Sequence, residues 1–362
     1  MEENVKRIIA ILALMLWLPG IAAGEREYFT IREIHEQAEA LMEQNGGTVN
    51  IKAAHGNFDV PIEVPDVDRV PIIKIDFPLE DQMPAAPENG KLERHLTSDD
   101  EYLAGWIGQA GSREELFGKY FKSSSRIGQY GMDARADGSP LSMEESICFA
   151  EQLLDAYRVK NGWDFHLCRA IARSRQYKAH YGRDDVIPDT SKALDETGYY
   201  DLYYEQTFYG IPFNDYISYT QPSRYYRNKP VPLGDTIMTI FSPDLYEYVL
   251  DVARETAVLA EDVPLCGLDK ILQSWKKAGK YSYRAKPSKI RFVYVSMYNP
   301  EDKEGEQILV PVWALEDDIG PDWSSGSMAY VNAQTGEFIN HNEEKDRDGH
   351  RGDAVWITWD DI

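Results

Sequence analysis

Residues 289–315 read KIRFVYVSMYNPEDKEGEQILVPVWAL, and this stretch decides the expected fold. Two runs rich in β-branched and aromatic residues enclose a polar segment, in which Asp302–Gly305 is expected to form a hairpin turn. Thr335–Gly336 marks a second turn further along the chain. These features predict consecutive antiparallel strands at Lys289–Tyr298, Gln307–Leu315, Met328–Asn332 and Glu337–Asn340.

Helical patterns precede these strands, at Leu245–Val258 and at Leu268–Ala278. The same order occurs upstream, where Ser142 and Glu145 form a capping box before one helix and a second helix is expected over Phe165–Tyr177. Three strand-like runs then follow, with Gly210-Ile211-Pro212 as the turn between the first two: Tyr199–Tyr209, Phe213–Thr220 and Thr236–Phe241.

The repeated order predicts an α+β fold with two helix-plus-antiparallel-sheet units, residues 141–244 and 245–362, the second ending in an acidic tail. A small α+β region, residues 25–140, precedes them, and residues 79–97 are expected to be its linker. One larger α+β domain without a true repeat is the alternative. The Gly-rich stretch Ser123–Pro140 marks the main expected boundary.

The expected elements of the N-terminal region are local. Thr30 and Glu33 form a capping box at the start of a helix that continues to Asn45. A short helical piece is expected around Glu114–Phe121. The strand-like runs of this region are Thr48–Ala53, Val60–Val64 and Val70–Phe77.

Residues 1–24 have the order of a secretory signal peptide: basic Lys6 and Arg7, a short apolar run, a helix breaker, and small residues before a cut after Gly24. A cut after Ala23 and an uncleaved N-terminal anchor are the alternatives. No later stretch is apolar enough to span a membrane. We therefore expect a secreted or cell-surface protein.

Cysteine usage indicates no disulfide framework. The three cysteines, Cys148, Cys168 and Cys266, are an odd number and match no zinc-binding spacing. They are expected to be buried small hydrophobic residues, and a Cys148–Cys168 bridge is the alternative that export would permit.

Composition and motifs exclude several functions. The net charge of −23 argues against nucleic acid as a partner. The chain contains no H-E-x-x-H, G-x-S-x-G or P-loop motif, and its seven histidines are scattered, so neither an enzyme nor a cofactor is expected. A carboxylate pair of a cell-wall hydrolase would escape detection among 61 acidic residues, so that class stays open.

Val310–Trp313, followed by Ala329–Glu337, resembles the closing hairpin of PepSY-like repeats, and Gly210-Ile211-Pro212 resembles the corresponding turn of an earlier copy. The layout is similar to that of uncharacterised exported or lipoprotein-like proteins of gut Clostridia with repeats of the YycH/YycI/YpeB type. The resemblance implies binding or regulation and no catalytic residues. No cysteine lies next to the signal, so lipid anchoring does not carry over.

Two groups of side chains are candidate sites. Tyr199, Tyr203 and Tyr209 fall on one face of a strand in the tyrosine-rich segment Tyr199–Tyr226, where exposed rings could bind a glycan; ordinary sheet packing is the alternative. Near the C-terminus, a cluster of carboxylates could bind Ca²⁺ or form a solvated acidic loop. Its candidate ligands are Glu344, Asp346 and Asp348.

The charge distribution offers a third candidate. Residues 270–300 carry a net charge of +8, including Lys276, Lys277 and Lys280, whereas residues 301–362 carry −12. This basic segment could attract an anionic wall polymer, or the acidic segment could fold back and neutralise it.

Together these observations predict a non-catalytic exported binding or regulatory protein at the Gram-positive cell surface, with a protein or peptide partner at the cell envelope. A glycan-binding module and a cell-wall hydrolase are the alternatives.

Overall fold

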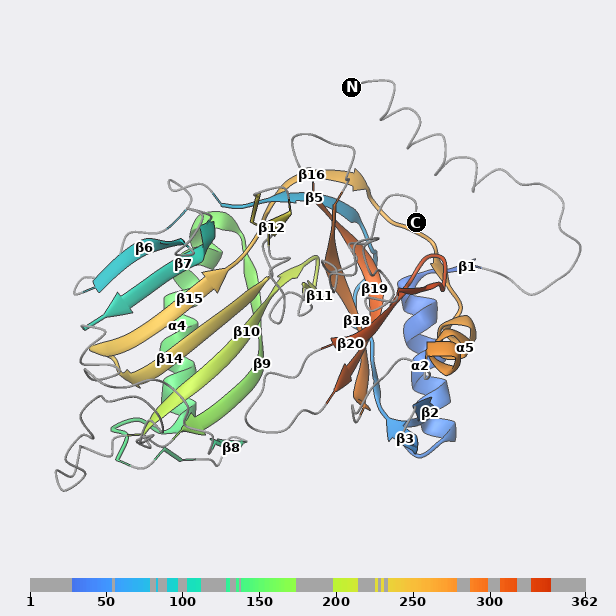
Figure 1. Ribbon diagram of the computed structural model, residues 1–362, viewed down its shortest axis with the longest axis horizontal. Helices are drawn as coiled ribbons and strands as arrows, with labels where there is room; N and C mark the ends of the chain where they lie inside the picture. The colour runs from blue at the N-terminus through green and yellow to red at the C-terminus, as the bar shows by residue number, and fades with distance from the viewer. Residues whose placement is uncertain are drawn as a thin grey trace, which may run out of the picture.

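The computed structural model describes residues 28–53, 56–78, 83, 90–96, 103–111, 128–130, 135–136, 138–173, 198–213, 225–226, 229–230, 234–278, 287–298, 307–317 and 327–339. The fold is mixed α+β. Two sheets, the first antiparallel and the second antiparallel apart from its β18–β4 pair, lie side by side, and each is covered on one face by helix (Figure 1). The order of helix and then antiparallel strands occurs twice, after α4 and after α5.

The first sheet is a half-barrel in which every neighbouring pair is antiparallel. Its strands in spatial order are β6 (Gly90–Leu96), β7 (Leu103–Ala110), β15 (Leu245–Asp251), β14 (Asp235–Ser242), β10 (Tyr199–Phe208), β9 (Asp164–Arg173) and β8 (Gly128–Tyr130), and β11 (Ile211–Pro212) pairs with β10.

Helix α4 (Met143–Asn161) covers one face of the half-barrel (Figure 1). The predicted capping box at its start is confirmed, because Ser142 and Glu145 bond reciprocally. The helix ends at Gly162, whose φ of 68° is the left-handed conformation that glycine adopts without strain. The buried face of α4 packs against the inward side chains of β10, which include Tyr200 and Tyr204.

The second sheet follows the order β16 (Arg254–Ala260), β5 (Ile72–Asp76), β19 (Gln307–Asp317), β18 (Pro287–Tyr298) and β4 (Ile62–Glu63), with β20 (Ser327–Asn332) and β21 (Phe338–Ile339) continuing from β19. Helices α2 (Ile31–Gln44) and α5 (Leu268–Ala278) lie on one side of it (Figure 1). Residues of both helices share one hydrophobic core with this sheet. The Thr30–Glu33 capping box of α2 is confirmed.

Three two-stranded ladders complete the described elements: β1 (Tyr28–Phe29) with β17 (Leu265–Cys266), β2 (Val49–Ala53) with β3 (Gly56–Val60), and β12 (Tyr225–Tyr226) with β13 (Lys229–Pro230).

The half-barrel is an insertion within the second sheet. All its strands come from residues 90–251, whereas the strands of the second sheet come from residues 62–76 and 254–339. The sheets therefore do not follow the predicted boundaries of 25–140, 141–244 and 245–362. The expected linker 79–97 contains β6, whose hydrogen bonds to β7 extend the half-barrel.

Two predicted helices are wrong. Residues 165–177 include β9, which pairs with β10 over its length, and residues 245–258 contain β15 and part of β16. The apolar side chains of both segments also fit an alternating pattern, and aromatic residues such as Tyr246 and Tyr248 favour strands. The helix at Leu268–Ala278 and the four strands after it are confirmed, within a few residues.

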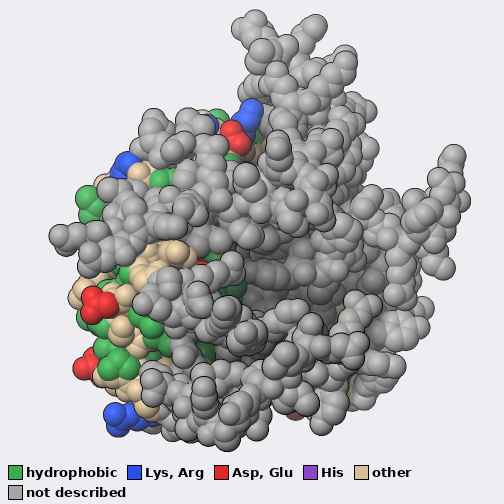
Figure 2. Space-filling view, turned by 60° about the vertical axis from the view of Figure 1, so that its left-hand side comes forward, with side chains coloured by type: hydrophobic (Ala, Val, Ile, Leu, Met, Phe, Trp, Pro, Cys, Tyr) green, Lys and Arg blue, Asp and Glu red, His purple; other side chains and the backbone are tan. Residues whose placement is uncertain are grey.

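Other predictions fall outside the described residues: the signal peptide, the helical piece at Glu114–Phe121 and the turn at Asp302–Gly305. Within the described part of the chain, no helix is long and apolar enough to cross a membrane. On the face shown in Figure 2, the described charged side chains of both signs are scattered rather than grouped by sign.

Candidate functional site

The candidate site lies where the half-barrel meets the second sheet. The buried Gln206 side chain fixes this junction, because its Nε2 donates to the Ala253 carbonyl oxygen and its Oε1 accepts from the Ala253 amide, both at 2.7 Å. Ala253 lies between β15 of the half-barrel and β16 of the second sheet. The reciprocal pair therefore holds the chain where it crosses from one sheet to the other.

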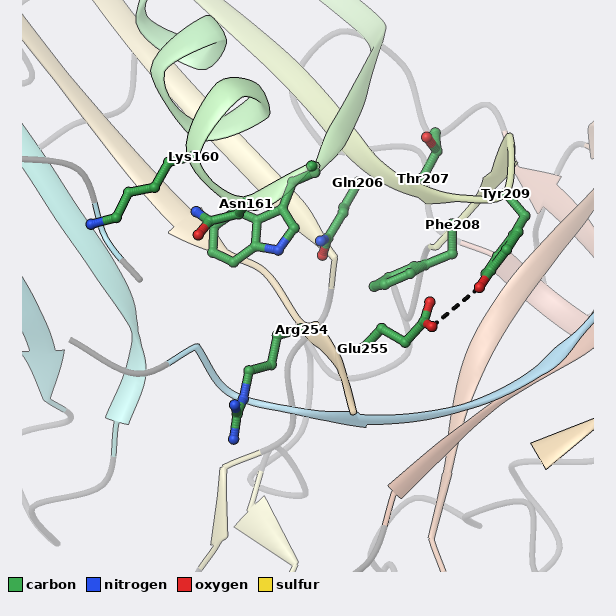
Figure 3. Close-up of a pocket in the computed structure, with 10 residues that line it drawn as sticks. Lys160, Asn161, Gln206, Thr207, Phe208, Tyr209, Arg254 and Glu255 are labelled. Atoms are coloured by element: carbon green, nitrogen blue, oxygen red, sulfur yellow. Dashed lines mark hydrogen bonds between the residues drawn. The ribbon is translucent and has the colours of Figure 1, made fainter. Parts of the chain in front are cut away.

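A pocket of about 660 Å³ opens beside this junction (Figure 3). Three segments line it: the end of α4, the end of β10 and the start of β16. Its volume lies within the ~300–1,000 Å³ of typical small-molecule sites. The lining residues are Lys160, Asn161, Gly162, Trp163, Gln206, Thr207, Phe208, Tyr209, Arg254 and Glu255.

We call this cavity the junction pocket. Its charged side chains differ in the partners that they contact. The Tyr209 hydroxyl donates to Glu255 Oε1 at 3.1 Å, and the Arg69 guanidinium lies 4.8 Å from the centre of the Tyr209 ring. Desolvation, and then the negative charge of Glu255, raise the pKa of Tyr209. The nearest carboxylate oxygen to Arg254 belongs to Asp76, at 3.6 Å.

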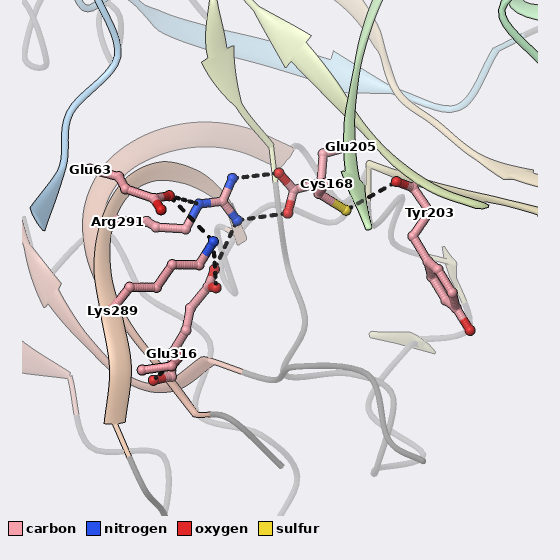
Figure 4. A network of polar contacts seen from close by, with 8 residues as sticks. Glu63, Cys168, Tyr203, Glu205, Lys289, Arg291 and Glu316 are labelled. Atoms are coloured by element: carbon pink, nitrogen blue, oxygen red, sulfur yellow. Dashed lines mark hydrogen bonds and ion pairs between the residues drawn. The ribbon is translucent and has the colours of Figure 1, made fainter. Parts of the chain in front are cut away.

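A buried ion network also joins the two sheets (Figure 4). Arg291 of β18 binds Glu205 of β10 with two bonds: Nη1 donates to Oε1 at 2.8 Å and Nη2 to Oε2 at 2.5 Å. Arg291 Nη1 also donates to Glu316 of β19 at 2.8 Å, and Glu63 of β4 lies 3.4 Å from Nε. Lys289 adds contacts to Glu63 at 3.3 Å and to Glu316 at 3.5 Å.

We call this set the junction clamp: Glu63, Glu205, Lys289, Arg291 and Glu316. The Arg291 side chain is only 8% exposed, and those of Glu205 and Glu316 are 4% exposed. The neighbouring carboxylates raise the pKa of Arg291 against the opposing effect of burial, so the guanidinium stays charged. Removing the buried cation or either buried acid would leave an uncompensated charge in the interior, which is strongly destabilising. The clamp is therefore a structural element.

Cys168 lies beside the junction clamp (Figure 4). It is the extra residue of a β-bulge, because Tyr203 pairs with Arg169 and Tyr204 pairs with Leu167. Cys168 is an exposed residue, yet its sulfur donates to the Tyr203 carbonyl oxygen at 3.2 Å. Desolvation of the thiol and the charge of Glu205 raise its pKa, so it is a poor nucleophile at neutral pH.

A smaller cavity of about 350 Å³ reaches the clamp from the side of His166 and Asp164. Arg291 forms part of its wall, and Thr207 lines both this cavity and the junction pocket. The junction pocket and this smaller cavity are therefore separated by the C-terminal end of β10, where Thr207 contributes to the lining of both.

The half-barrel face away from α4 carries a second buried polar group. Arg173 Nε and the Thr239 hydroxyl both donate to Asp201, each at 2.8 Å. Desolvation raises the pKa of Asp201 despite the opposing charge of Arg173. Thr239 pairs with Asp201 on one side and with Glu247 on the other, so the two acids share this face.

The structure does not bring the three predicted tyrosines together. Tyr199 is buried against Phe241, with ring centres 4.8 Å apart. Tyr203 is half-buried, with the Arg169 guanidinium 5.6 Å from its ring centre, and desolvation raises its pKa to about 12. Tyr209 lies beyond the other end of β10, about 30 Å from Tyr199 by strand geometry, and lines the junction pocket.

The structure describes part of the basic segment, residues 270–300. Lys289 and Arg291 both contact Glu316, so at these two positions the acidic segment neutralises the basic one. Lys276 and Lys277 belong to α5, but their side chains lie outside the described residues. Lys280 and the candidate calcium ligands Glu344, Asp346 and Asp348 also lie outside them.

Among the residues that the structure describes, no group of three His, Cys, Asp or Glu side chains could hold a metal ion. The three cysteines are free, and Cys148 and Cys168 are exposed rather than buried as the sequence suggested. Cys266 is buried, and desolvation raises its pKa to about 11.

Sequence reasoning missed the junction pocket. Trp163, Arg254 and Glu255 belong to no motif, and Arg254 falls within a segment predicted to be helical. Only the inserted arrangement of the half-barrel brings residues 160–163, 206–209 and 254–255 together, so no local signal could have identified them.

No protein-family model matches the chain, and no curated protein is significantly similar to it in sequence. Among solved structures, it is similar to an uncharacterised protein from Eubacterium rectale ATCC 33656, with a TM-score of 0.50 and 14% identity over 84% of this chain and 98% of that one. At this level of identity the likeness concerns the fold alone.

Proposed function

We propose that this protein is a non-catalytic binding or regulatory protein, exported to the Gram-positive cell surface, and that its ligand or partner engages the junction pocket. The pocket carries this proposal because it combines aromatic walls with a few charged groups, as binding sites for organic ligands do. The signal-like residues 1–24 support export. The PepSY-like resemblance of Val310–Trp313 and Ala329–Glu337 also implies binding or regulation.

The lining residues of the pocket favour binding over catalysis. Those that the structure describes include neither a histidine nor a cysteine, and the one carboxylate among them, Glu255, accepts the bond from Tyr209. A general base must reach the proton that it removes, and nucleophilic catalysis needs an activated hydroxyl or thiol. Thr207 carries the one aliphatic hydroxyl among the described lining residues. This hydroxyl donates to Asp164 Oδ2 at 3.3 Å, on the other side of β10.

The proposal is tested by ligand retention. The protein is incubated with peptides and small molecules released from the host cell surface, and bound species are identified by ultrafiltration and mass spectrometry. An Asn161→Trp substitution places a large side chain in the junction pocket at its α4 wall, and Thr256→Trp places the same side chain at an exposed position of β16 outside the lining.

We expect a species that wild type and Thr256→Trp retain and Asn161→Trp does not. Retention of the same species by all three proteins would show that the junction pocket is not the site. Retention of nothing by wild type would count against a binding function.

A cell-wall hydrolase is the second candidate, and Asp201 favours it. Its raised pKa suits a general acid, and Glu247 lies two strands away on the same face. Two strand spacings separate these residues by about 10 Å at the backbone, close to the carboxylate separation of inverting glycosidases. Release of soluble fragments from purified peptidoglycan, abolished by Asp201→Asn, would favour this candidate over the first.

A further inference from the structure

We propose that the junction pocket binds the carboxylate of an apolar or aromatic ligand, with Arg254 as the group that recognises it. This inference rests on the proposed binding function and specifies the chemistry of its ligand. It starts from Arg254, the first residue of β16, which lines the pocket together with the end of α4 and the end of β10.

Arg254 has unused hydrogen-bonding capacity. A guanidinium has five N–H donors, and a carboxylate can accept two of them in parallel. The Arg254 side chain makes no hydrogen bond to another described residue: it forms an ion pair with Asp76, whose Oδ2 is 3.6 Å from Nη2, and its enclosed Nε has no acceptor. The side chain is 25% exposed, so a ligand can reach its outer edge. An enclosed N–H donor without an acceptor is costly, and a ligand that accepts a hydrogen bond would relieve that cost.

The other charged groups of the pocket leave Arg254 as the available cation. Lys160 donates to the Met83 carbonyl oxygen, and in Figure 3 its ammonium group points away from Arg254. The Glu255 carboxylate turns towards Tyr209, whose hydroxyl it binds, and so away from Arg254 (Figure 3).

A second donor points to the same kind of ligand. Asn161 lines the pocket at the end of α4, and its Nδ2 is enclosed without an acceptor among the described residues. Buried donors are rarely left unpaired in folded proteins. Two such donors in the lining of one pocket indicate that the pocket is suited to a group that accepts hydrogen bonds.

The remaining wall determines what the carboxylate is attached to. Trp163 and Phe208 are both 7% exposed and give the pocket an aromatic surface. Aromatic walls stabilise apolar and ring-bearing groups by contact area and by ring packing. The pocket therefore fits an apolar body that ends in a carboxylate, which can be the C-terminus of a peptide or a small organic acid.

The experiment compares three probes with purified protein by calorimetry: N-acetyl-Ala-Ala-Phe with a free carboxylate, the same peptide as its C-terminal amide, and 3-phenylpropionate. We expect wild type to bind the free acid at least about tenfold more tightly than the amide, because charge-assisted bonds to Arg254 are lost. Equal affinity for 3-phenylpropionate identifies a small acid as sufficient, and preference for the peptide acid identifies a peptide C-terminus.

Two substitutions in the pocket should act with opposite signs. Arg254→Gln should weaken binding of the acid about tenfold and remove its advantage over the amide, whereas Glu255→Gln should strengthen it by removing a nearby negative charge. Arg32→Gln is the matched control, because it removes the same charge at an exposed helix position outside the pocket. Unfolding midpoints establish that each variant is folded.

The outcomes separate this inference from the proposed function. Equal binding of acid and amide, or acid binding that Arg254→Gln does not change, overturns the carboxylate inference and leaves a binding function in place. Failure of all three probes overturns it as well. The proposed function fails only if wild type also retains nothing from the cell-surface extract.

Discussion

Replacing Arg291 by methionine should be among the most damaging single substitutions in the described part of the chain. Arg291 donates two bonds to Glu205 and one to Glu316, at 2.5–2.8 Å, and all three side chains are buried. Methionine keeps much of the length and none of the charge, so two acids are left buried without their cation. Removing one partner of such a pair costs about 3–5 kcal/mol. We expect a loss of that size for Arg291→Met.

The assay is urea unfolding followed by tryptophan fluorescence, with the loss taken from the change in midpoint at constant slope. Arg291→Met combined with Glu205→Gln should recover part of the loss, because the double variant no longer buries the unpaired Glu205 charge. Arg32→Met is the control, because its exposed pair with Asp68 contributes about 0–1 kcal/mol. A loss below about 1 kcal/mol for Arg291→Met would refute the view that the clamp holds the two sheets together.

Three further predictions concern the half-barrel. Desolvation raises the pKa values of Tyr203 and Tyr246 to about 12, so tyrosinate absorbance should show both side chains ionising about two pH units above free tyrosine. Because the pKa of each is higher in the folded state, the stability that the two tyrosines contribute is present below pH 10 and is lost as the pH rises to 12. Gly108→Ala should destabilise by about 1–3 kcal/mol in thermal unfolding, because the added Cβ would lie 2.0 Å from Tyr248 Cζ; an unchanged midpoint would contradict this packing. Asp201 has a raised folded pKa, so the stability of wild type relative to Asp201→Asn should increase as pH falls from neutral towards 4, and a constant difference would exclude the shift.

Local chemistry explains which elements could be predicted. The capping boxes at Thr30 and Ser142 join residues three positions apart, so the sequence alone identifies both helix starts, and the structure confirms them. The strands between Pro287 and Asn332 are rich in β-branched, aromatic and other apolar residues and are also confirmed.

Long-range pairing explains the errors. Phe165–Arg173 has apolar residues that satisfy both a helical and an alternating pattern, and only pairing with β10 decides between them. The Gly90–Leu96 strand has a polar sequence typical of a loop, and it is ordered by pairing with β7 in the half-barrel. A boundary at residue 140 or 244 was expected because sequence windows cannot show that distant segments share a sheet.

The junction was predictable only in part. The neutralisation of the basic segment by the acidic segment could be foreseen, and Glu316 provides it for Lys289 and Arg291. The role of Glu205 could not, because it lies 86 positions before Arg291 in a strand noted only for its tyrosines. Arg254 was equally hidden, since an isolated arginine in a short segment carries no sign of the pocket that it lines.

The central claim is that the junction pocket is where this protein meets its ligand, and hydrogen–deuterium exchange tests it most directly. Wild-type protein is compared with and without the fraction of the cell-surface extract that it retains. The account predicts slower exchange at residues 160–163, 206–209 and 254–255, which line the pocket, and little change in α2. Protection confined to the half-barrel face around Asp201, or unchanged exchange at all three pocket segments, would contradict it.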